Sequence, residues 1–302
     1  MLVERERIGL VDIDLITARI WPGGNAETEV LGGGITNHNY KVTTGGNKYV
    51  LRIAGRDTSL LGIDRRVEYE ASLAAAAVGV GPDVVAFVEP EGYLVTRFIE
   101  GSIVPVSQMR EEGSIRRVAQ ALRAVHQGPS LSARFISFRV VEDYRTTAFA
   151  RGAEVPPSYA WARQIARRVE RARGAFPERP CHNDLLNANF IDDGTRIRIV
   201  DWEYAGMGDV FFDLANFAIN HELGREERQG LLEAYVGSVR PGDERALELM
   251  LLMSDFREAM WGVVQGAVSE LEFDFAAYAA EHFERMEATA STPAFVAALG
   301  DL

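Results

Sequence analysis

The chain of 302 residues contains a single cysteine, Cys181. One cysteine excludes an intrachain disulfide and a zinc site with four thiolate ligands, and it suits the reducing cytoplasm in which we expect the protein to reside. Basic residues are also scarce, because 32 Lys and Arg stand against 44 Asp and Glu, which gives a net charge of −12. That charge repels a phosphate backbone, so nucleic acid is excluded as a partner and cationic small molecules are favoured.

Long apolar runs are missing as well. The longest weakly polar stretch, residues 71–81, is mostly alanine and is far shorter than a membrane span. Residues 1–7 mix Glu with Arg and no apolar signal core follows them, so we expect an unprocessed chain without a membrane span. With 47% hydrophobic and 25% charged residues, the composition is that of an ordinary globular protein.

The hydrophobic pattern changes about one third of the way along the chain. The elements predicted before that point are two strands within residues 30–53 around the glycine turn 45–47, a helix over 64–77, and strands over 84–88 and 93–99. Beyond Gly101 the helical period dominates, and one strand pair near 190–191 and 197–200 interrupts it. The predicted fold class is α+β, with an N-terminal sheet lobe that carries one main helix, residues 1–98, and a larger, mainly helical lobe, residues 99–302.

Three polar residues in the second lobe have a spacing that suits phosphoryl transfer. Asn189 follows Asp184 by five residues, and the apolar strand 197–200 leads to Asp201. Phosphoryl transfer needs a carboxylate that orients and accepts the proton of an attacking hydroxyl, and oxygen ligands that hold magnesium on the nucleotide phosphates. Magnesium takes only one or two carboxylates, so this sparse set suits it better than calcium. Taken singly, each residue is equally typical of a turn, a cap or a strand end.

The neighbouring residues extend this pattern over nearly forty positions. The segments are His182-Asn183-Asp184 with Asn189, Asp201-Trp202-Glu203-Tyr204-Ala205-Gly206, Gly208-Asp209, and Asp213-Leu214-Ala215-Asn216-Phe217. They resemble the active-site motif of the aminoglycoside phosphotransferase and choline kinase superfamily, whose fold is that of protein kinases. The resemblance implies ATP and Mg²⁺ as cofactors, with Asp184 as catalytic base, Asn189 and Asp201 as metal ligands, and Asp213 as a brace of the loop.

The N-terminal lobe resembles the nucleotide-binding part of the same superfamily. By that resemblance the phosphates lie on a glycine-rich loop that includes Gly33, Gly34, Thr36 and Asn37. Arg52 stands where most kinases carry a lysine that touches the phosphates, and arginine there resembles choline kinases. Its expected partner is Glu70, with Glu68 as the fallback, although such a pair could also be a surface pair of little energetic value. The adenine is expected at the backbone of Arg97, Phe98 and Ile99.

The C-terminal part resembles the choline and ethanolamine kinases. The resemblance rests on Trp261-Gly262-Val263-Val264-Gln265 and on Leu271-Glu272-Phe273-Asp274-Phe275 with Tyr278. It implies that Trp261 and Phe273 face a cationic group of the acceptor, and we include Glu203 and Glu258 in the same pocket. The alternative is a packing stripe, because Trp261, Val264, Val268 and Leu271 also fall at helical spacing.

Two departures from choline kinases bear on the acceptor. Glu258 stands where these enzymes tend to carry a further tryptophan, and Asn220 stands where they tend to carry a glutamate. A primary ammonium prefers hydrogen-bond acceptors to aromatic faces, so Glu258 favours ethanolamine or another amino alcohol, unless it points to solvent. The expected acceptor is therefore choline, ethanolamine or a similar amino alcohol. The alternatives are an aminoglycoside or thiamine, or a catalytically inactive nucleotide-binding protein, and a homodimer is left open.

Overall fold

The computed structural model describes residues 12–32, 37–55, 58–269 and 271–300. By their contacts the residues form two compact units, one made of Met1–Gly55 and Val84–Phe98, the other of Arg56–Asp83 and Ile99–Leu302. The segment Arg56–Asp83 groups with the larger unit because its buried Ala71 and Ala75 belong to the core of that unit. The division of the chain into lobes at residue 98 stays a prediction.

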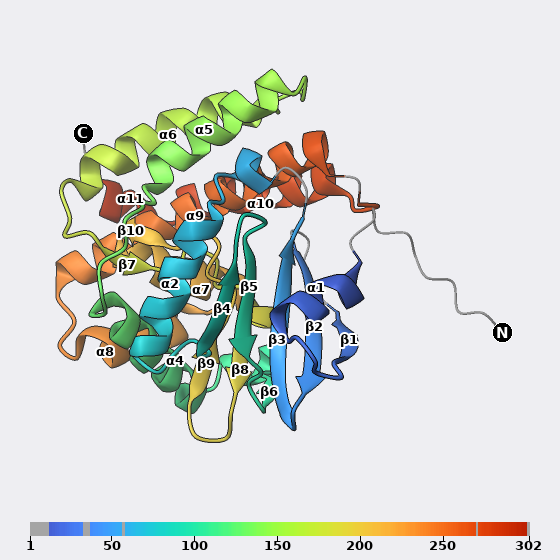
Figure 1. Cartoon of the computed structure of the whole chain (residues 1–302). Coiled ribbons are helices and arrows are strands. Elements are labelled where there is room, and N and C mark those ends of the chain that lie inside the picture. Colours follow the sequence, from blue (N-terminus) through green and yellow to red (C-terminus); the bar gives the residue numbers. More distant parts are fainter. Residues whose placement is uncertain (1–11, 33–36, 56–57, 270, 301–302) are drawn as a thin grey trace. The chain divides into compact units, whose positions relative to one another are not determined.

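A five-stranded antiparallel sheet forms most of the smaller unit, in the order β1-β2-β3-β5-β4 (Figure 1). Its strands are β1 (Glu27–Leu31), β2 (Asn37–Thr44), β3 (Asn47–Ala54), β4 (Val84–Val88) and β5 (Tyr93–Arg97). The helix α1 (Ile13–Ile20) packs its isoleucines against the buried Val42, Leu51 and Val95 of the sheet. The alternating pattern predicted from the sequence thus has one face buried under this helix.

The turn between β2 and β3 is where the sequence placed it. Thr44 pairs with Asn47, and the two residues between them, Gly45 and Gly46, have φ angles of 56° and 74°. A two-residue hairpin of this kind requires positive φ at both central positions, which glycine adopts without steric cost. The predicted glycine turn is confirmed.

The larger unit contains the remaining elements. Its helices are α2 (Arg65–Ala77), α3 (Val106–Met109), α4 (Glu112–His126), α5 (Ser137–Ala150), α6 (Ser158–Arg173), α7 (Val210–Asn220), α8 (Arg225–Val236), α9 (Pro241–Val268), α10 (Phe275–Ala290) and α11 (Pro293–Leu299), with two short 3₁₀ helices, η1 (Thr58–Leu61) and η2 (Asn187–Asn189). Its strands are β6 (Ser102–Ile103), β7 (Arg179–Cys181), β8 (Phe190–Asp192), β9 (Ile197–Ile199) and β10 (Gly206–Gly208).

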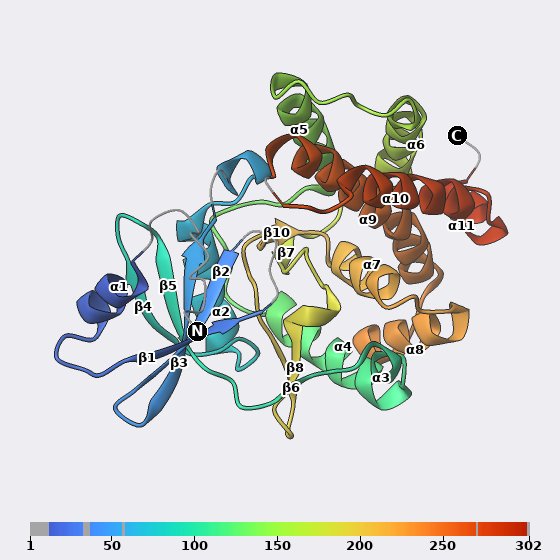
Figure 2. The ribbon, with the colours of Figure 1, turned by 90° about the vertical axis from the view of Figure 1, so that its right-hand side faces the viewer.

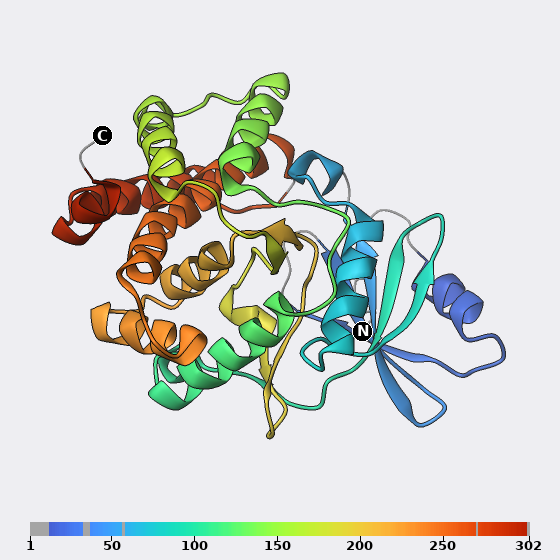
Figure 3. The same cartoon turned by 90° about the vertical axis from the view of Figure 1, so that its left-hand side faces the viewer.

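The long helix α9 is the centre of this unit. It has 28 residues, and nearly every residue from Ala246 to Gln265 is buried. Helices α5, α7, α10 and α11 pack around it, and Figures 2 and 3 show α10 and α11 along one side of it. A helix that is covered all round must bury whatever polar residues it carries, and these therefore need partners inside the core.

The predicted strand pair is present as β8 and β9, which pair antiparallel, and β6 joins them at the other edge of β8. The α+β fold class is confirmed by an antiparallel sheet followed by a mainly helical chain. The sequence alternative of a helical packing stripe from Trp261 to Leu271 is wrong at its last residue. The helix α9 ends at Val268, and Leu271 is 50% exposed. Within the described ranges, every helix is too short or too polar to traverse a lipid bilayer.

The helix α2 begins at a capping aspartate. Asp64 is the N-cap residue, and its Oδ1 accepts hydrogen bonds from the amides of Arg66 at 2.8 Å and Val67 at 3.4 Å. We expect Asp64→Ala to lower the free energy of unfolding by about 1 kcal/mol in urea titrations, because two amides lose their acceptor. Glu111, the N-cap residue of α4, makes no such bond. Glu111→Ala should therefore change stability by less than about 0.5 kcal/mol, and an equal loss in both variants would contradict the capping role.

Candidate active site

The loop after β7 is held by a buried carboxylate on α7. Asp213 is fully buried, and its Oδ2 and Oδ1 accept hydrogen bonds from the backbone amides of His182 at 2.8 Å and Asn183 at 2.7 Å. Asn183 has a φ of 68°, which is uncommon for a residue with a side chain. The two bonds stabilise this conformation, so Asp213 determines the path of the chain immediately before Asp184.

Asp213 is itself held in place by a buried histidine of α4. His126, the last residue of α4, places Nε2 3.0 Å from Oδ2 of Asp213 and Nδ1 2.7 Å from the hydroxyl of Tyr235. Cys181 lies nearby, and burial raises the pKa of its thiol well above the usual range. His126, Cys181 and Asp213 could by proximity hold a metal ion. However, the oxygens of Asp213 already accept two amide protons, so we interpret this group as structural.

His182 is neutral and fixed in one tautomer. Burial lowers its pKa. Its Nε2 lies 2.9 Å from the carbonyl oxygen of Val200, and its Nδ1 accepts the amide proton of Asp184 at 3.2 Å. Because Nδ1 is an acceptor, the proton resides on Nε2, where it donates to Val200. His182 therefore connects the loop to the end of β9 and is not placed for acid–base chemistry.

The structure brings the three predicted phosphoryl-transfer residues into one network. Nδ2 of Asn189, at the end of η2, donates to the carbonyl oxygen of Asp184 at 2.9 Å, and the amide of Val200 donates to the carbonyl of Asn189 at 3.0 Å. Asp201 follows directly, with a φ of 70°. Since Nδ2 of Asn189 is already engaged, its Oδ1 is the atom left to bind a cation.

Asp184 lies among other charged side chains. Its Oδ1 accepts a hydrogen bond from Nη1 of Arg257 at 2.9 Å. Burial raises the pKa of Asp184 to about 7, the carboxylates of Glu258, Asp201 and Glu203 add to this rise, and Arg257 opposes it. A carboxylate with a raised pKa is a stronger proton acceptor than an ordinary aspartate.

The carboxylate of Asp201 and the amide oxygen of Asn189 are oxygen donors of the kind that Mg²⁺ binds. The divalent ion prefers oxygen ligands and takes few of them from the protein. Burial is the main cause of the raised pKa of Asp184, and the repulsion by neighbouring carboxylates that adds to it is one that a bound cation would relieve. Asn189 and Asp201 are thus suited to hold the metal.

Glu258 does not point to solvent, in contrast to one of the sequence alternatives. It is 2% exposed, and its Oε1 accepts from Nη1 of Arg257 at 2.7 Å while its Oε2 accepts from the hydroxyl of Tyr278 at 3.0 Å. Although burial works against the charged form, Arg257 holds the pKa of Glu258 below its ordinary value. Asn216, which also fixes the amide of Leu185 at 2.6 Å, donates to Oε1 at 3.3 Å.

The aromatic residues predicted for the acceptor pocket differ in their surroundings. Trp261 is 8% exposed, belongs to the hydrophobic core, and donates through Nε1 to the hydroxyl of Tyr204 at 3.0 Å. Phe273 is 48% exposed, and its described ring contacts are with Phe275 and Tyr278. The guanidinium carbon of Arg257 lies 4.4 Å from the ring centroid of Tyr204. Trp261 therefore packs in the core and also holds the tyrosine beneath Arg257, whereas Phe273 lies at the surface.

Another predicted pocket residue, Glu203, is buried beside α2. Its Oε2 lies 3.3 Å from Nη1 of Arg65, and the same nitrogen lies 2.6 Å from Glu68. The other glutamate of α2, Glu70, accepts hydrogen bonds from the amide and hydroxyl of Ser132. Arg52 belongs to the other compact unit, so its pairing with Glu70 or Glu68 stays a prediction.

The residues predicted to bind the nucleotide are described only in part. Gly33, Gly34 and Thr36 lie outside the described residues. Asn37 is buried at the start of β2, and Arg52 lies in β3 opposite Leu94 of β5.

The residues at the end of β5, where the adenine is expected, are all described. Arg97 donates to Oδ1 of Asn47 at 3.0 Å and lies over the ring of Tyr49 at 4.9 Å. The amide of Phe98 donates to the carbonyl of Lys48 at 3.1 Å, and Ile99 is half-buried at the start of the next unit. Their role in binding adenine stays a prediction.

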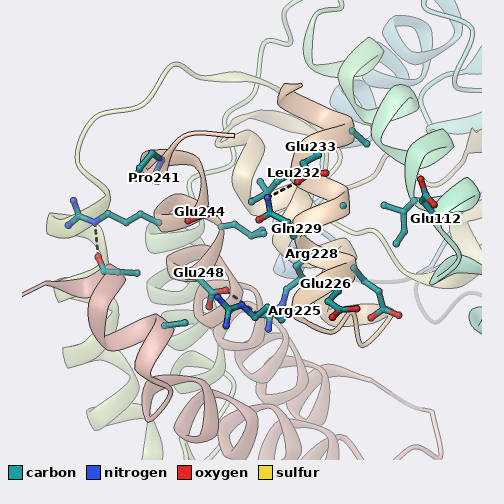
Figure 4. Close-up of a pocket in the computed structure, with 18 of the residues that line it drawn as sticks. Glu112, Arg225, Glu226, Arg228, Gln229, Leu232, Glu233, Pro241, Glu244 and Glu248 are labelled. Atoms are coloured by element: carbon teal, nitrogen blue, oxygen red, sulfur yellow. Dashed lines mark hydrogen bonds and ion pairs between the residues drawn. The ribbon is translucent and has the colours of Figure 1, made fainter. Parts of the chain in front are cut away.

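A separate groove of about 1740 Å³ lies on the helical unit (Figure 4). It is formed by α4, α8, α11 and the first part of α9, and many charged side chains line it, such as Arg225, Glu226 and Glu248. None of Asp184, Asn189 and Asp201 is among its lining residues. The groove is therefore separate from the network around Asp184.

Known proteins resemble this chain over most of its length. Residues 27–249, which include the loop, match the phosphotransferase enzyme family. A solved choline/ethanolamine kinase family protein from Mesorhizobium loti is 30% identical, with a TM-score of 0.81 over 95% of this chain and 97% of that one. The chain belongs to the choline/ethanolamine kinase family. The kinase-like fold expected from the sequence is thereby confirmed.

Two curated relatives carry more specific names. The protein LicA of Haemophilus influenzae is 28% identical over 211 residues, which cover 67% of this chain and 61% of LicA. The chain therefore spans less than two thirds of the length of that relative. Human ethanolamine kinase 2 is 26% identical over 266 residues, covering 78% of this chain and 68% of the kinase.

The Asp213 brace can be tested by removing one acceptor. In Asp213→Asn one of the two amides of His182 and Asn183 faces an NH₂ group, and a buried amide without an acceptor costs about 1–3 kcal/mol. We expect that loss in the free energy of unfolding, measured with urea. Asp193→Asn is the control, because Asp193 accepts amide bonds through Oδ1 alone in the turn after β8. It should cost less than about 1 kcal/mol, and equal losses would show that Asp213 is not a special acceptor.

Proposed function

We propose that the chain is a small-molecule kinase that transfers the γ-phosphoryl group of ATP, with Mg²⁺, to the hydroxyl of choline, ethanolamine or a similar amino alcohol. One observation carries the proposal above all others. Asp184, Asn189 and Asp201 meet in a single hydrogen-bonded and electrostatic network around a braced loop. The names of the relatives, choline and ethanolamine kinases, support the acceptor class.

In this mechanism the protein mainly orients the reacting groups and stabilises their charges. Asp184 orients the acceptor hydroxyl and takes its proton, and its raised pKa suits that task. Arg257 holds one oxygen of Asp184, so the other oxygen is the one directed to the hydroxyl. Asn189 and Asp201 would hold the metal, which when bound neutralises charge on the transferring phosphoryl group.

The first experiment is a screen of ATP consumption by the purified chain with choline, ethanolamine, thiamine and several aminoglycosides. We expect turnover with an amino alcohol to exceed turnover with the other acceptors. A preference for thiamine or for an aminoglycoside would support the kinase activity but would show that the proposed acceptor class is wrong. No transfer to any acceptor by a folded chain that binds Mg·ATP would contradict the proposed function.

Asp184→Asn tests the proton acceptor. The amide oxygen can still accept from Arg257, so we expect the fold and nucleotide binding to persist while kcat falls on the order of 10²-fold or more. Turnover is measured by product formation, and nucleotide binding by calorimetry. Asp193→Asn, in the turn between β8 and β9, should retain wild-type turnover. If Asp184→Asn also retains it, Asp184 is not the base.

Asp201→Asn tests the metal site. Asparagine tolerates the positive φ of this position, so the variant removes the charge without the strain that alanine would introduce. We expect the affinity for Mg·AMP-PNP to fall at least about tenfold, whereas the affinity for AMP-PNP without Mg²⁺ stays within about twofold. Calorimetric titrations with and without Mg²⁺ measure both. Equal losses in the two titrations would mean that Asp201 does not act through the metal.

A further inference from the structure

Both carboxylate oxygens of Glu258 are engaged inside the protein. The residue lies on α9 and is 2% exposed. Its Oε1 accepts from Nη1 of Arg257 at 2.7 Å and from Nδ2 of Asn216 at 3.3 Å, and its Oε2 accepts from the hydroxyl of Tyr278 at 3.0 Å. An acceptor ammonium would have to displace one of these donors in order to reach the carboxylate. The contacts therefore favour a role for Glu258 inside the protein over the acceptor-pocket role expected from the sequence.

The guanidinium of Arg257 connects Glu258 to the proposed proton acceptor. Its Nη1 donates to Oε1 of Glu258 at 2.7 Å and to Oδ1 of Asp184 at 2.9 Å. The two N–H bonds of this planar nitrogen have fixed directions, so the bond to Glu258 determines where the other N–H points. The ring centroid of Tyr204 lies 4.4 Å from the guanidinium carbon, and the hydroxyl of Tyr144 interacts with the same guanidinium. Arg257 is thus enclosed and has little freedom to reorient.

Asn216 connects the same carboxylate to the backbone beside Asp184. It is fully buried on α7, its Nδ2 donates to Oε1 of Glu258 at 3.3 Å, and its Oδ1 accepts from the amide of Leu185 at 2.6 Å. Leu185 follows Asp184 directly in the chain. The contacts therefore form a closed ring, which consists of Asp184, Arg257, Glu258, Asn216 and Leu185. Glu258 is the member of this ring that holds the side chain of Asp184 on one side and its backbone on the other.

The loss of Glu258 from the ring would change the bond between Arg257 and Asp184. Arg257 is 1% exposed, and its Nη1 divides its two N–H groups between two carboxylates. A buried guanidinium that loses one carboxylate turns toward the other, because a buried charge without a partner is costly. Asp184 would then be bound more tightly by Arg257 and would be less well oriented to take the proton of the acceptor hydroxyl.

We propose that Glu258 is a positioning residue for phosphoryl transfer, which holds Asp184 in its productive orientation through Arg257, and that it does not bind the ammonium group of the acceptor. The inference rests on the proposed kinase function and deepens it, because it assigns a role to a residue that the sequence placed in the acceptor pocket. The other position that departs from choline kinases belongs to the same network, since Nδ2 of Asn220 donates to Oδ1 of Asn216 at 3.2 Å.

Two variants of Glu258 separate positioning from acceptor binding. In Glu258→Gln the amide oxygen can still accept from Arg257, so the ring persists while the charge that could pair with an ammonium is lost. Glu258→Ala removes the acceptor of Arg257 altogether. Turnover is measured at saturating Mg·ATP with ethanolamine and with choline, and the affinity for each is measured by calorimetry on the whole chain saturated with Mg·AMP-PNP. We expect kcat to fall at least about tenfold in Glu258→Ala and at most about threefold in Glu258→Gln, with both affinities within about twofold of the wild type.

Other results would assign Glu258 differently. If Glu258→Gln binds ethanolamine at least about tenfold more weakly than the wild type does, Glu258 binds the acceptor and the proposal is overturned. A wild-type kcat in Glu258→Ala, or an equal loss of kcat in both variants, overturns it as well. If Glu258→Ala does not fold, the affinities of Glu258→Gln still decide between the two roles. Absence of phosphoryl transfer by the folded wild type, in contrast, contradicts the proposed kinase function itself, and the inference falls with it.

Asp255→Asn is the matched control for the loss of a buried carboxylate on α9. Asp255 is fully buried one turn before Glu258, and its Oδ1 lies 2.8 Å from Nδ1 of His282 and 3.2 Å from Nε of Arg285. We expect Asp255→Asn to lower the melting temperature and to keep kcat within about twofold of the wild type at a temperature at which thermal unfolding shows all variants folded. A loss of kcat as large as that of Glu258→Ala would show a general effect of disturbing α9 and would overturn the proposal.

Discussion

The candidate active site depends on one buried carboxylate that replaces water as the acceptor for two backbone amides. Asp213 accepts hydrogen bonds from the amides of His182 and Asn183 and so stabilises the positive φ of Asn183. Without these bonds the loop would need other acceptors inside a dry core, where an unsatisfied amide is costly. His126 orients the same carboxylate from α4, so the loop, α4 and α7 are connected by a single anion.

A second constraint follows from the burial of α9. Because helices surround it, Arg257 and Glu258 cannot reach solvent and must pair with each other and with Asp184. Buried ion pairs often contribute little net free energy to folding, so the main effect of this arrangement is on the geometry and charge of the site. It orients one oxygen of Asp184 and leaves the rest of the site negative. The packing of the helical unit and the electrostatics of the site are therefore two aspects of the same arrangement.

Much of this could be predicted from local patterns. The glycine turn of the first hairpin, the capping aspartate of α2 and the strand pair of β8 and β9 each reflect neighbours in sequence. The spacing of Asp184, Asn189 and Asp201 could be read in the same way, because a short loop and a short strand separate them. Arg257 was missed, although it precedes Glu258 directly. An arginine in an apolar helix was the available signal, and it does not reveal its partner.

What the sequence alone determined is the order of local elements and the identity of the chemical groups, because turns, caps and periodicity depend on neighbouring residues. Only the tertiary structure decided which groups meet. Arg257 and Asp184 are separated by 73 residues, and the packing of α9 against α7 and α5 is what brings helix and loop together. Burial then sets their charges: it raises the pKa of Asp184 and makes the pairing of Glu258 obligatory. The distance between Arg257 and Asp184 and the burial of both residues do not depend on their neighbours in sequence, so they could be known only from the fold.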